Sequence, residues 1–416
     1  MNTQRRRTGK VFAGVDVGNA KVSVVLATPV QGQLCILGQS AQSLPDTEQA
    51  KATMVEPQAL RSAMAACLAE AAALANVDVP TDIYVSVPAA SERSKVYKGT
   101  TRVARGTVSA EDVKQVLVNA RRASRVPGRE TLHVMPVDFQ LDNSTLVRDP
   151  MNRAAHLLSA RVQCVDGSVT RLQAVRQCAR SLDLSVEGVA ADVVAASAAV
   201  LCPDEKDHGV LLIDIGHAKT DIAVWIHGAM VHAAQIPFGG FHLAGDIGKI
   251  LSVSRSEALR LKREYGCAWA ESVNARETMM VASDRSRRHP RRVLATILEP
   301  RMREIMKRVR EELDALGLSD SLTQAVVTGG SSMLDGTLLV VTDVLGIPAR
   351  QGTPRRITGL VDGVRHPKYA AAVGVLLEAM DEQQSDSGAS GLFLMERRTR
   401  WQQWRRSARE LWDRFF

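Results

Sequence analysis

A short acidic hairpin occurs twice in the chain, and this repeat limits the possible folds more than any other feature. The copies read GVDVGNAKVSVVL (Gly14–Leu26) and LIDIGHAKTDIAVW (Leu212–Trp225). Each has two apolar runs around a turn, with Asp-x-Gly at the end of the first run. In such a turn, backbone N–H groups and a carboxylate can meet a phosphate or a hydrated metal ion. Two of these hairpins facing each other can clamp a nucleotide between two lobes.

A single Asp-x-Gly is ordinary hairpin chemistry and would not support a site. The second copy has the same order, so that Asp16-x-Gly18 corresponds to Asp214-x-Gly216. A further Gly-Gly turn follows an apolar run in AVVTGGSSMLDG (325–336). Together these features favour a binding site over two unrelated hairpins.

Length and cysteine content indicate a large cytosolic protein. A chain of 416 residues can hold several structural units. Its six cysteines have no C-x-x-C pairing and no zinc-type spacing, which indicates reduced thiols. No apolar run reaches about 18 residues, and the start MNTQRRRTGK lacks the apolar stretch of a signal peptide. We therefore expect a cytosolic chain without a membrane-spanning helix.

The positive charge is concentrated at the ends of the chain. The formal net charge is +8, and residues 396–416 contribute half of it, with seven arginines against three acidic residues. Arg5, Arg6, Arg7 and Lys10 add to the excess before the first apolar run. The middle of the chain is close to balanced, which argues against a nucleic-acid groove.

Strand and helix patterns alternate, as in a mixed α/β fold. Helices are predicted over 56–76 and Ser109–Ser124, the latter with Ser109 as N-cap and Asp112 as its partner. A long charged helix is expected over Glu299–Leu316, with Pro300 near its start. The basic run Arg285–Arg292 is interpreted as an exposed loop rather than a binding site.

The last 21 residues predict an amphipathic membrane-surface helix. Apolar side chains recur at helical spacing on one face, while the arginines lie largely off it. Arginines at mid-membrane would each cost about 2.5–3.5 kcal/mol, so the helix should lie in the interface and not span. Docking of this helix on protein is the alternative. The expected membrane-binding residues are Trp401, Trp404, Arg405, Arg406, Leu411, Trp412, Phe415 and Phe416.

Nearly the whole chain resembles the FtsA family of bacterial cell-division proteins, in the superfamily of actin, sugar kinases and heat-shock chaperones. The phrases that carry the resemblance occur in the family's order: GVDVGNAKVSVV, RETLHVMPVDFQLD (129–142), DVVAASAAVL (192–201), IDIGHAKTDIAVW, IPFGGFHLAGDI (236–247), RLKREYGCA (260–268), ILEPRMREIMKRVREEL (297–313), VVTGGSSMLDG and PKYAAAVGVLL (367–377). The inserted module after the first hairpin unit has the placement seen in FtsA and not in actin itself.

The resemblance implies an α/β, two-lobed, actin-like fold of the duplicated ribonuclease H type. It implies ATP or ADP with Mg²⁺ in the cleft, self-association into filaments, and tethering of the tubulin-like protein FtsZ to anionic inner-membrane lipids. The expected location is the cytoplasmic face of that membrane at the division septum, among other division proteins. The helical part of the second lobe carries partner contacts in FtsA.

Site residues follow from the resemblance position by position. Asp16 and Asp214 would serve Mg²⁺ through water, Lys21 would reach the phosphates, and Asp192 would stand beside the attacking water. Lys262 would lie near the base or ribose. The other expected nucleotide-binding residues are Gly18, Asn19, Gly216, His217, Lys219, Gly239, Gly240, Gly329, Gly330 and Ser331.

The second turn departs from the family pattern and implies a degenerate nucleotide site. FtsA relatives usually read D-I-G-G-G-T-T-D, whereas this chain has His217, Ala218 and Lys219 after Gly216. His217 and Ala218 add Cβ atoms where a phosphate-binding backbone often needs positive φ or close approach. Lys219 and Lys21 add charge that favours phosphate. Binding is therefore expected to be weak or non-hydrolytic.

We expect the following organisation: a basic tail (1–10), a first lobe (11–88 and 165–202), an inserted α+β subdomain (89–164), a second lobe (203–240 and 318–380), its helical subdomain (241–317), a flexible linker (381–395) and the amphipathic helix (396–416). The alternatives are a pilus-associated actin-like assembly protein or a sugar-kinase-type enzyme. A kinase needs an acidic general base over a substrate pocket, and no further carboxylate motif marks one.

Overall fold

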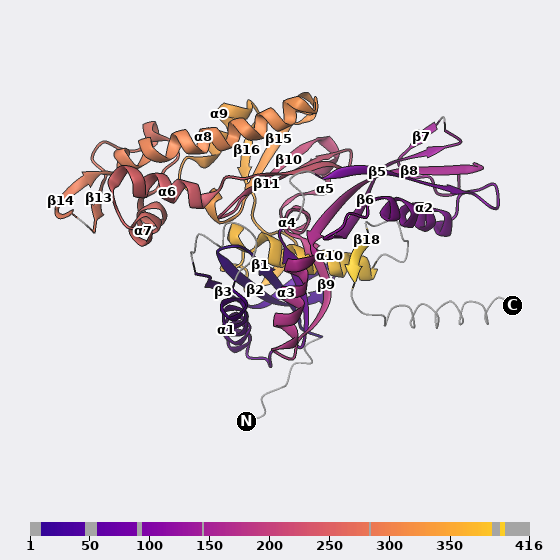
Figure 1. Ribbon diagram of the computed structural model, residues 1–416, viewed down its shortest axis with the longest axis horizontal. Helices are drawn as coiled ribbons and strands as arrows, with labels where there is room; N and C mark the ends of the chain where they lie inside the picture. Colours follow the sequence, from indigo (N-terminus) through magenta and orange to yellow (C-terminus); the bar gives the residue numbers. More distant parts are fainter. Residues whose placement is uncertain are drawn as a thin grey trace.

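The computed structural model describes residues 10–45, 56–89, 94–143, 145–282, 284–384 and 392–395. Two lobes, each built on its own β-sheet, are stacked in Figure 1, and a smaller α+β module projects to one side. Among the described helices, none has the length and apolar character needed to cross a membrane. The described residues do not include the expected membrane-binding side chains of Trp401, Trp404, Arg405, Arg406, Leu411, Trp412, Phe415 and Phe416.

The first lobe is a mixed sheet whose central strands are buried on both faces. Its strands are β1 (Phe12–Val17), β2 (Lys21–Val30), β3 (Gln33–Ser43), β4 (Asp82–Val87) and β9 (Ser185–Ala191). β1, β2 and β3 pair antiparallel, β4 runs parallel to β1, and β9 runs parallel to β4. The short β17 (Ile357–Gly359) pairs with β3. Burial on both faces explains why β2 is mostly apolar from Val22 to Ala27 and does not alternate between apolar and polar residues.

Helices cover both faces of this sheet. α1 (Pro57–Ala75) packs on β2 and β3, and α3 (Val169–Arg180) contacts β9. α10 (Ala370–Gln384) and α4 (Asp192–Val200) contact each other and the other face, and α4 also contacts the second sheet. Gly374 permits this close crossing, because a Cβ there would fall 1.7 Å from the Ala195 carbonyl oxygen. α4 therefore lies between the two lobes.

The second lobe repeats the arrangement of the first. Its strands are β10 (Val210–Ile215), β11 (Thr220–Ile226), β12 (Ala229–Ile236), β15 (Gln324–Thr328) and β16 (Ala349–Gln351). They lie in the order β12-β11-β10-β15-β16, with β15 parallel to β10 as β4 is to β1. α9 (Thr337–Leu345) packs on this sheet and on α8 (Arg291–Ala315), and α5 (Pro203–His208) precedes β10.

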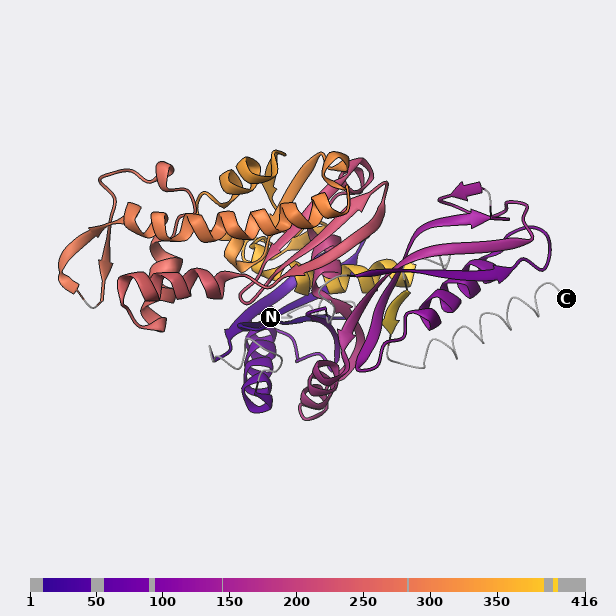
Figure 2. The ribbon, with the colours of Figure 1, turned by 45° about the horizontal axis from the view of Figure 1, so that its top comes forward.

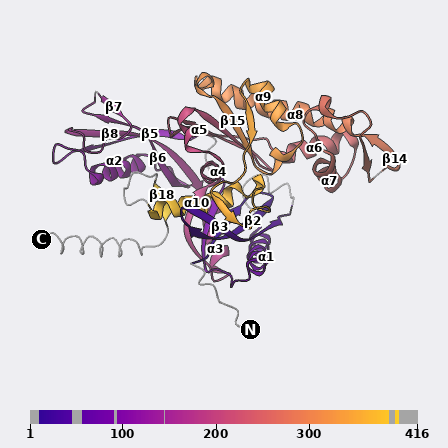
Figure 3. The same ribbon diagram turned by 180° about the vertical axis from the view of Figure 1, so that it is seen from behind.

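The inserted module has a hydrophobic core of its own. It consists of β5 (Lys95–Arg102), α2 (Ala110–Ala123), β6 (Arg129–Leu141), β7 (Thr145–Val147) and β8 (Leu157–Ser168). The predicted cap of α2 is confirmed, since Ser109 Oγ accepts from the Asp112 N–H and Asp112 Oδ2 accepts from the Ser109 N–H. Figures 2 and 3 show this module and the α6–α8 region at opposite ends of the molecule.

Two expectations for the helical subdomain were wrong. This region contains α6 (Gly240–Leu251), α7 (Arg255–Tyr265) and a hairpin of β13 (Thr278–Val281) and β14 (Asp284–Pro290). The run expected to be a loop therefore forms a strand and the start of α8. That helix begins at Arg291 and contains Pro300 in its interior. The buried face Leu294, Leu298, Met302 continues through the proline at a spacing of four, and this packing outweighs the lost N–H.

The expected linker over 381–395 is also partly ordered structure. Residues 381–384 continue α10, and β18 (Leu392–Met395) pairs antiparallel with both β9 and β6. The apolar sequence LFLM supplies backbone groups to two strand edges that face each other. β18 therefore joins the first lobe's sheet to that of the inserted module, next to α10 in Figure 1. Four short 3₁₀ turns are described: η2 (Ala270–Ser272), η3 (Ser319–Ser321), η4 (Gly330–Met333) and η5 (Pro367–Tyr369).

Candidate functional site

The two copied turns have the same geometry. The Gly18 N–H donates to the Lys21 carbonyl oxygen at 3.1 Å, and the Gly216 N–H donates to the Lys219 carbonyl oxygen at 3.0 Å. The strand registers also agree, since the first aspartate of each copy pairs with the residue seven positions later. The repeat seen in the sequence is therefore a repeat of structure.

Asp16 at the end of β1 and Asp214 at the end of β10 face one cleft between the lobes, as predicted. The cleft has a volume of about 710 Å³. The predicted site residues that line it are Asp16, Gly18, Asn19, Lys21, Asp192, Asp214, Gly216, His217, Lys219, Lys262, Gly329, Gly330 and Ser331. Gly239 and Gly240 are not among the lining residues and pack behind the second turn instead.

Glycines let three backbone segments meet at the second turn. A Cβ on Gly329, whose φ is +89°, would lie 2.2 Å from Asp214 Oδ1. A Cβ on Gly239 would lie 2.7 Å from the His217 carbonyl oxygen, and one on Gly240 would lie 2.7 Å from Lys262 Nζ. These positions hold the acidic turn against η4 and the start of α6.

Side chains complete these contacts. Lys262 Nζ donates to the Gly240 carbonyl oxygen at 2.9 Å, and Ser331 Oγ donates to the Gly216 carbonyl oxygen at 3.0 Å. In the first turn, Arg171 of α3 donates from Nη1 to Asn19 Oδ1 at 3.0 Å. These contacts join the second turn to η4, tie α7 to the start of α6, and hold the Asn19 side chain of the first turn.

Four aspartates form an acidic cluster in the cleft: Asp16, Asp192, Asp214 and Asp221. Burial raises the pKa of Asp16 to about 6. Burial, and next the charge of Asp221, raises the pKa of Asp214. Burial, and next the charge of Asp192, raises the pKa of Asp221 to about 7. Carboxylates that repel each other in this way favour a cation among them.

Two lysines lie close to the acidic cluster. Burial lowers the pKa of Lys21 to about 8, although Asp16 opposes this effect. Burial would lower the pKa of Lys219 too, but Asp192 and Asp221 outweigh it and raise that pKa. Lys219 therefore remains a charged ammonium within the cluster.

The expectation that positions 217 and 218 need positive φ was wrong. Neither residue has positive φ, so the second turn does not require glycine at these positions. The His217 ring packs edge-on against Phe241, with ring centroids 5.6 Å apart. The substitutions leave the turn unstrained and add side-chain atoms at the wall of the cleft.

Sequence reasoning missed several residues around the cleft. Asp221 could have been found, because it pairs with Asp214 in the repeated hairpin register. Asp335 lies in the quoted GGSSMLDG phrase, and Arg291 lies in the basic run interpreted as a loop. Ser86, which donates to Asp16 Oδ1 at 3.0 Å, carries no signal in the sequence.

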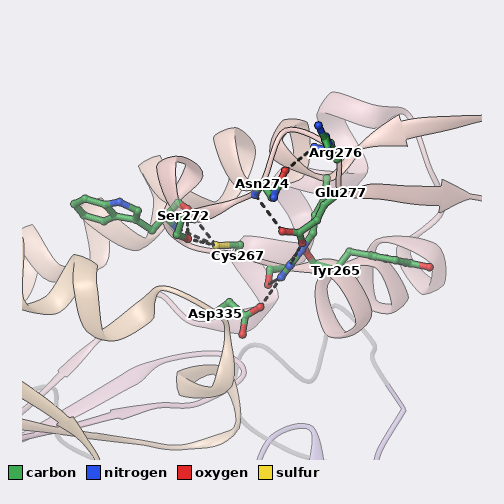
Figure 4. A network of polar contacts seen from close by, with 10 residues as sticks. Tyr265, Cys267, Ser272, Asn274, Arg276, Glu277 and Asp335 are labelled. Atoms are coloured by element: carbon green, nitrogen blue, oxygen red, sulfur yellow. Dashed lines mark hydrogen bonds and ion pairs between the residues drawn. The ribbon is translucent and has the colours of Figure 1, made fainter.

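Arg291 lines the cleft and connects three segments there. Its Nε donates to the Tyr265 carbonyl oxygen at 2.8 Å, and its Nη1 donates to Glu277 Oε2 at 2.6 Å. Its Nη2 donates to Asp335 Oδ2 at 2.5 Å. Figure 4 shows Glu277 and Asp335 converging near Tyr265. The loop after η4 is thereby joined to the end of α7 and the start of α8.

The residues fit a nucleotide better than they fit a metal ion alone. Mg²⁺ takes six oxygen ligands and keeps several waters. Among the described side chains, no group of three or more His, Cys, Asp or Glu is arranged to hold a metal ion. Asp16 and Asp214 can face a hydrated cation that arrives with phosphates. They do not form a metal site by themselves.

Two family models match the chain. One, described as cell division protein FtsA, matches residues 211–374. The other, described as an SHS2 domain inserted in FtsA, matches residues 90–166 and so covers the inserted module.

Solved structures share the fold. A chain of a PilM-PilN type IV pilus biogenesis complex has a TM-score of 0.62 at 15% identity, over 88% of this chain and 97% of that one. MreB5 of Spiroplasma citri bound to ADP has a TM-score of 0.53 at 12% identity, over 91% and 98% of the two chains. At these identities the likeness shows the fold alone, and the expected two-lobed actin-like fold is confirmed.

Relatives in sequence show more than the fold. The cell division protein FtsA of Escherichia coli is 27% identical over 385 residues, 88% of this chain and 90% of the relative. FtsA of Pseudomonas aeruginosa is 31% identical over 382 residues, which is 91% of each chain. Because this identity extends over both lobes and the inserted module, the chain belongs to the FtsA family of cell division proteins.

Proposed function

We propose that this chain is an actin-like adaptor that binds ATP or ADP between its lobes and tethers FtsZ filaments to the cytoplasmic face of the inner membrane at the division septum. Membership of the FtsA family supports the division role. The observation that carries the nucleotide role is the meeting of Asp16 and Asp214, from two copied turns, in one cleft. Self-association and contacts with other division proteins belong to the same proposal.

The cleft has the size and backbone exposure that a nucleotide needs. Ligand pockets hold about 300–1,000 Å³, and this one falls within that range. The turns after Gly18 and Gly216 offer backbone N–H groups to phosphates, and Lys21 adds charge. Asp16 and Asp214 would face Mg²⁺ through water, and Lys262 would lie by the ribose or base. MreB5, which shares the fold, has been solved with ADP and with AMPPNP.

Slow hydrolysis follows from the surroundings of Asp192. Its Oδ1 accepts from the Val193 N–H at 2.8 Å, and its Oδ2 lies 3.6 Å from Lys219 Nζ. A carboxylate whose two oxygens already have partners is less available to orient an attacking water. This ion pair supports binding with little turnover.

The membrane part of the proposal rests on the sequence of residues 396–416. Three of the five tryptophans fall there, with seven arginines. Aromatic side chains contribute buried area at the interface, and arginines favour anionic lipid. β18 ends at Met395 between β9 and β6, so the proposed tether leaves the body beside the inserted module.

Flotation with vesicles tests the adaptor. Polymerised FtsZ is mixed with the full chain and vesicles containing anionic lipid, and the vesicles are floated on a density gradient. FtsZ should float when the chain is present and stay at the bottom when it is omitted. FtsZ that stays at the bottom in both samples, while the chain itself floats, would contradict the FtsZ role and leave the membrane role standing.

A further inference from the structure

The lysines of the two copied turns have different partners. Lys21 Nζ donates to Ser23 Oγ at 2.9 Å and to the Lys368 carbonyl oxygen at 2.5 Å. Lys219 Nζ donates to Asp221 Oδ1 at 2.8 Å and lies 3.6 Å from Asp192 Oδ2. The residue two positions after the lysine is therefore a hydroxyl in one copy and a carboxylate in the other.

We propose that the Lys219 ammonium is a resident cation of the acidic cluster. It supplies positive charge that a divalent metal ion would otherwise bring. Nucleotide binding in this cleft therefore depends little on Mg²⁺. The nucleotide part of this inference rests on the proposed function. The part about the cluster itself stands on the position of Lys219 alone.

The ion pairs are buried enough for their charge to matter. The side chains of Lys219, Asp192 and Asp221 are only 16%, 15% and 6% exposed. Pairs shielded from water and salt interact far more strongly than surface pairs. The ammonium is also a compact charge on a tethered chain, so it competes with a free metal ion at high effective concentration.

Asp192 and Asp221 come from different lobes, which makes Lys219 a link as well as a charge. Asp192 begins α4, directly after β9 of the first lobe, whereas Asp221 lies on β11 of the second lobe. A metal ion entering between these two carboxylates would have to displace the ammonium. Within the described residues, no group of three or more His, Cys, Asp or Glu side chains could hold a metal ion instead.

The first test compares ATP binding by the full-length protein in Mg²⁺ and in EDTA by isothermal titration. The wild type should show dissociation constants within about threefold of each other, whereas Lys219→Met should bind at least about tenfold more weakly in EDTA. Lys21→Met is the matched control, because it removes the same charge from the same turn position. Its ratio between the two conditions should resemble that of the wild type.

The second test uses Mn²⁺ without nucleotide, followed by its electron paramagnetic resonance signal. Lys219→Met should bind one more Mn²⁺ per chain than the wild type, and Lys21→Met should not. A wild type that loses ATP affinity about tenfold or more in EDTA overturns the proposal, as does a folded Lys219→Met that gains no Mn²⁺. If no protein binds ATP under either condition, the proposed nucleotide function fails and the Mn²⁺ result alone decides the role of Lys219.

Discussion

The imidazole of His133 accepts a hydrogen bond at Nε2 from the backbone N–H of Ala191, at 2.9 Å. His133 lies on β6 of the inserted module, and Ala191 ends β9 of the first lobe. The next residue is Asp192, a member of the acidic cluster. The inserted module is therefore bonded to the backbone that positions a carboxylate in the cleft.

Because of this contact, we expect the folded protein to become less stable in acid. Burial lowers the pKa of His133 to about 3, below its ordinary value of 6.5. Below pH 6.5 His133 binds a proton in the unfolded chain but stays neutral in the folded chain. The free energy of unfolding therefore falls by up to about 1.4 kcal/mol per pH unit between pH 6.5 and pH 3. His133→Gln keeps an acceptor but cannot titrate. Urea unfolding between pH 7 and pH 5 should show a flatter pH dependence for this variant.

His133→Leu serves as the comparison. It removes the acceptor and leaves a buried N–H unpaired, which costs about 1–3 kcal/mol. The loss should be present at pH 7, where titration of His133 plays no part. Equal slopes for wild type and His133→Gln would show that His133 does not carry the acid sensitivity.

Gly329 and Gly330 form a matched pair for testing the second turn. The φ angle of Gly329 is +89°, and a Cβ on this residue would lie 2.2 Å from Asp214 Oδ1. A Cβ on Gly330 would have no atom within 4 Å. Gly329→Ala should cost about 1–3 kcal/mol of unfolding free energy and weaken ATP binding. Gly330→Ala should change stability by less than about 1 kcal/mol. Denaturant unfolding and titration with ATP measure both effects, and equal losses for the two variants would contradict the role of Gly329.

The site could be predicted from the sequence where its geometry is local. Asp16 and Asp214 end strands of hairpins whose pairing is set by nearby residues, so the repeat was enough to place both carboxylates. The ion pair of Lys219 with Asp192 joins residues 27 positions apart in different lobes. Nothing in either short segment encodes that approach, which depends on how α4 packs between the sheets.

For the fold too, features set by neighbouring residues could be predicted, and features set by distant residues could not. The cap of α2 was predictable because Ser109 and Asp112 lie in one turn of helix. The pairing of β18 was not, because its partners β6 and β9 lie more than 200 residues earlier. Pro300 was read as a helix start, since a proline is most often found there, while the packing that keeps it inside α8 is tertiary.

Arg291 should stabilise the part of the cleft wall that it joins. Replacing it by methionine removes the donors to Glu277 and Asp335 and to the carbonyl oxygen of Tyr265. We expect a loss of about 1–3 kcal/mol, arising mainly at the carbonyl because the acidic partners are partly exposed. Arg292→Met is the control, since Arg292 is the exposed neighbour. Urea unfolding gives the energies, and faster hydrogen exchange at residues 265–266 in Arg291→Met alone would locate the effect.

The proposed membrane segment gives the last prediction. On the helix proposed for residues 396–416, Trp401, Trp404, Leu411, Trp412 and Phe415 would share one face. Each large apolar side chain contributes roughly 1.5–3 kcal/mol when it is buried. Trp404→Glu with Trp412→Glu should therefore abolish co-sedimentation with vesicles containing anionic lipid. The folded body should be unaffected, since these positions follow β18 in the sequence.

Charge should matter less than the aromatic face. Arg405→Ala with Arg406→Ala should lose about 2 kcal/mol of membrane binding at low salt, because each basic residue near an anionic surface adds about 1 kcal/mol. The loss should shrink as added salt screens the surface, since the Debye length falls to about 8 Å at physiological ionic strength. If the double glutamate variant still sediments with vesicles as the wild type does, residues 396–416 dock on protein, and the tether must lie elsewhere in the chain.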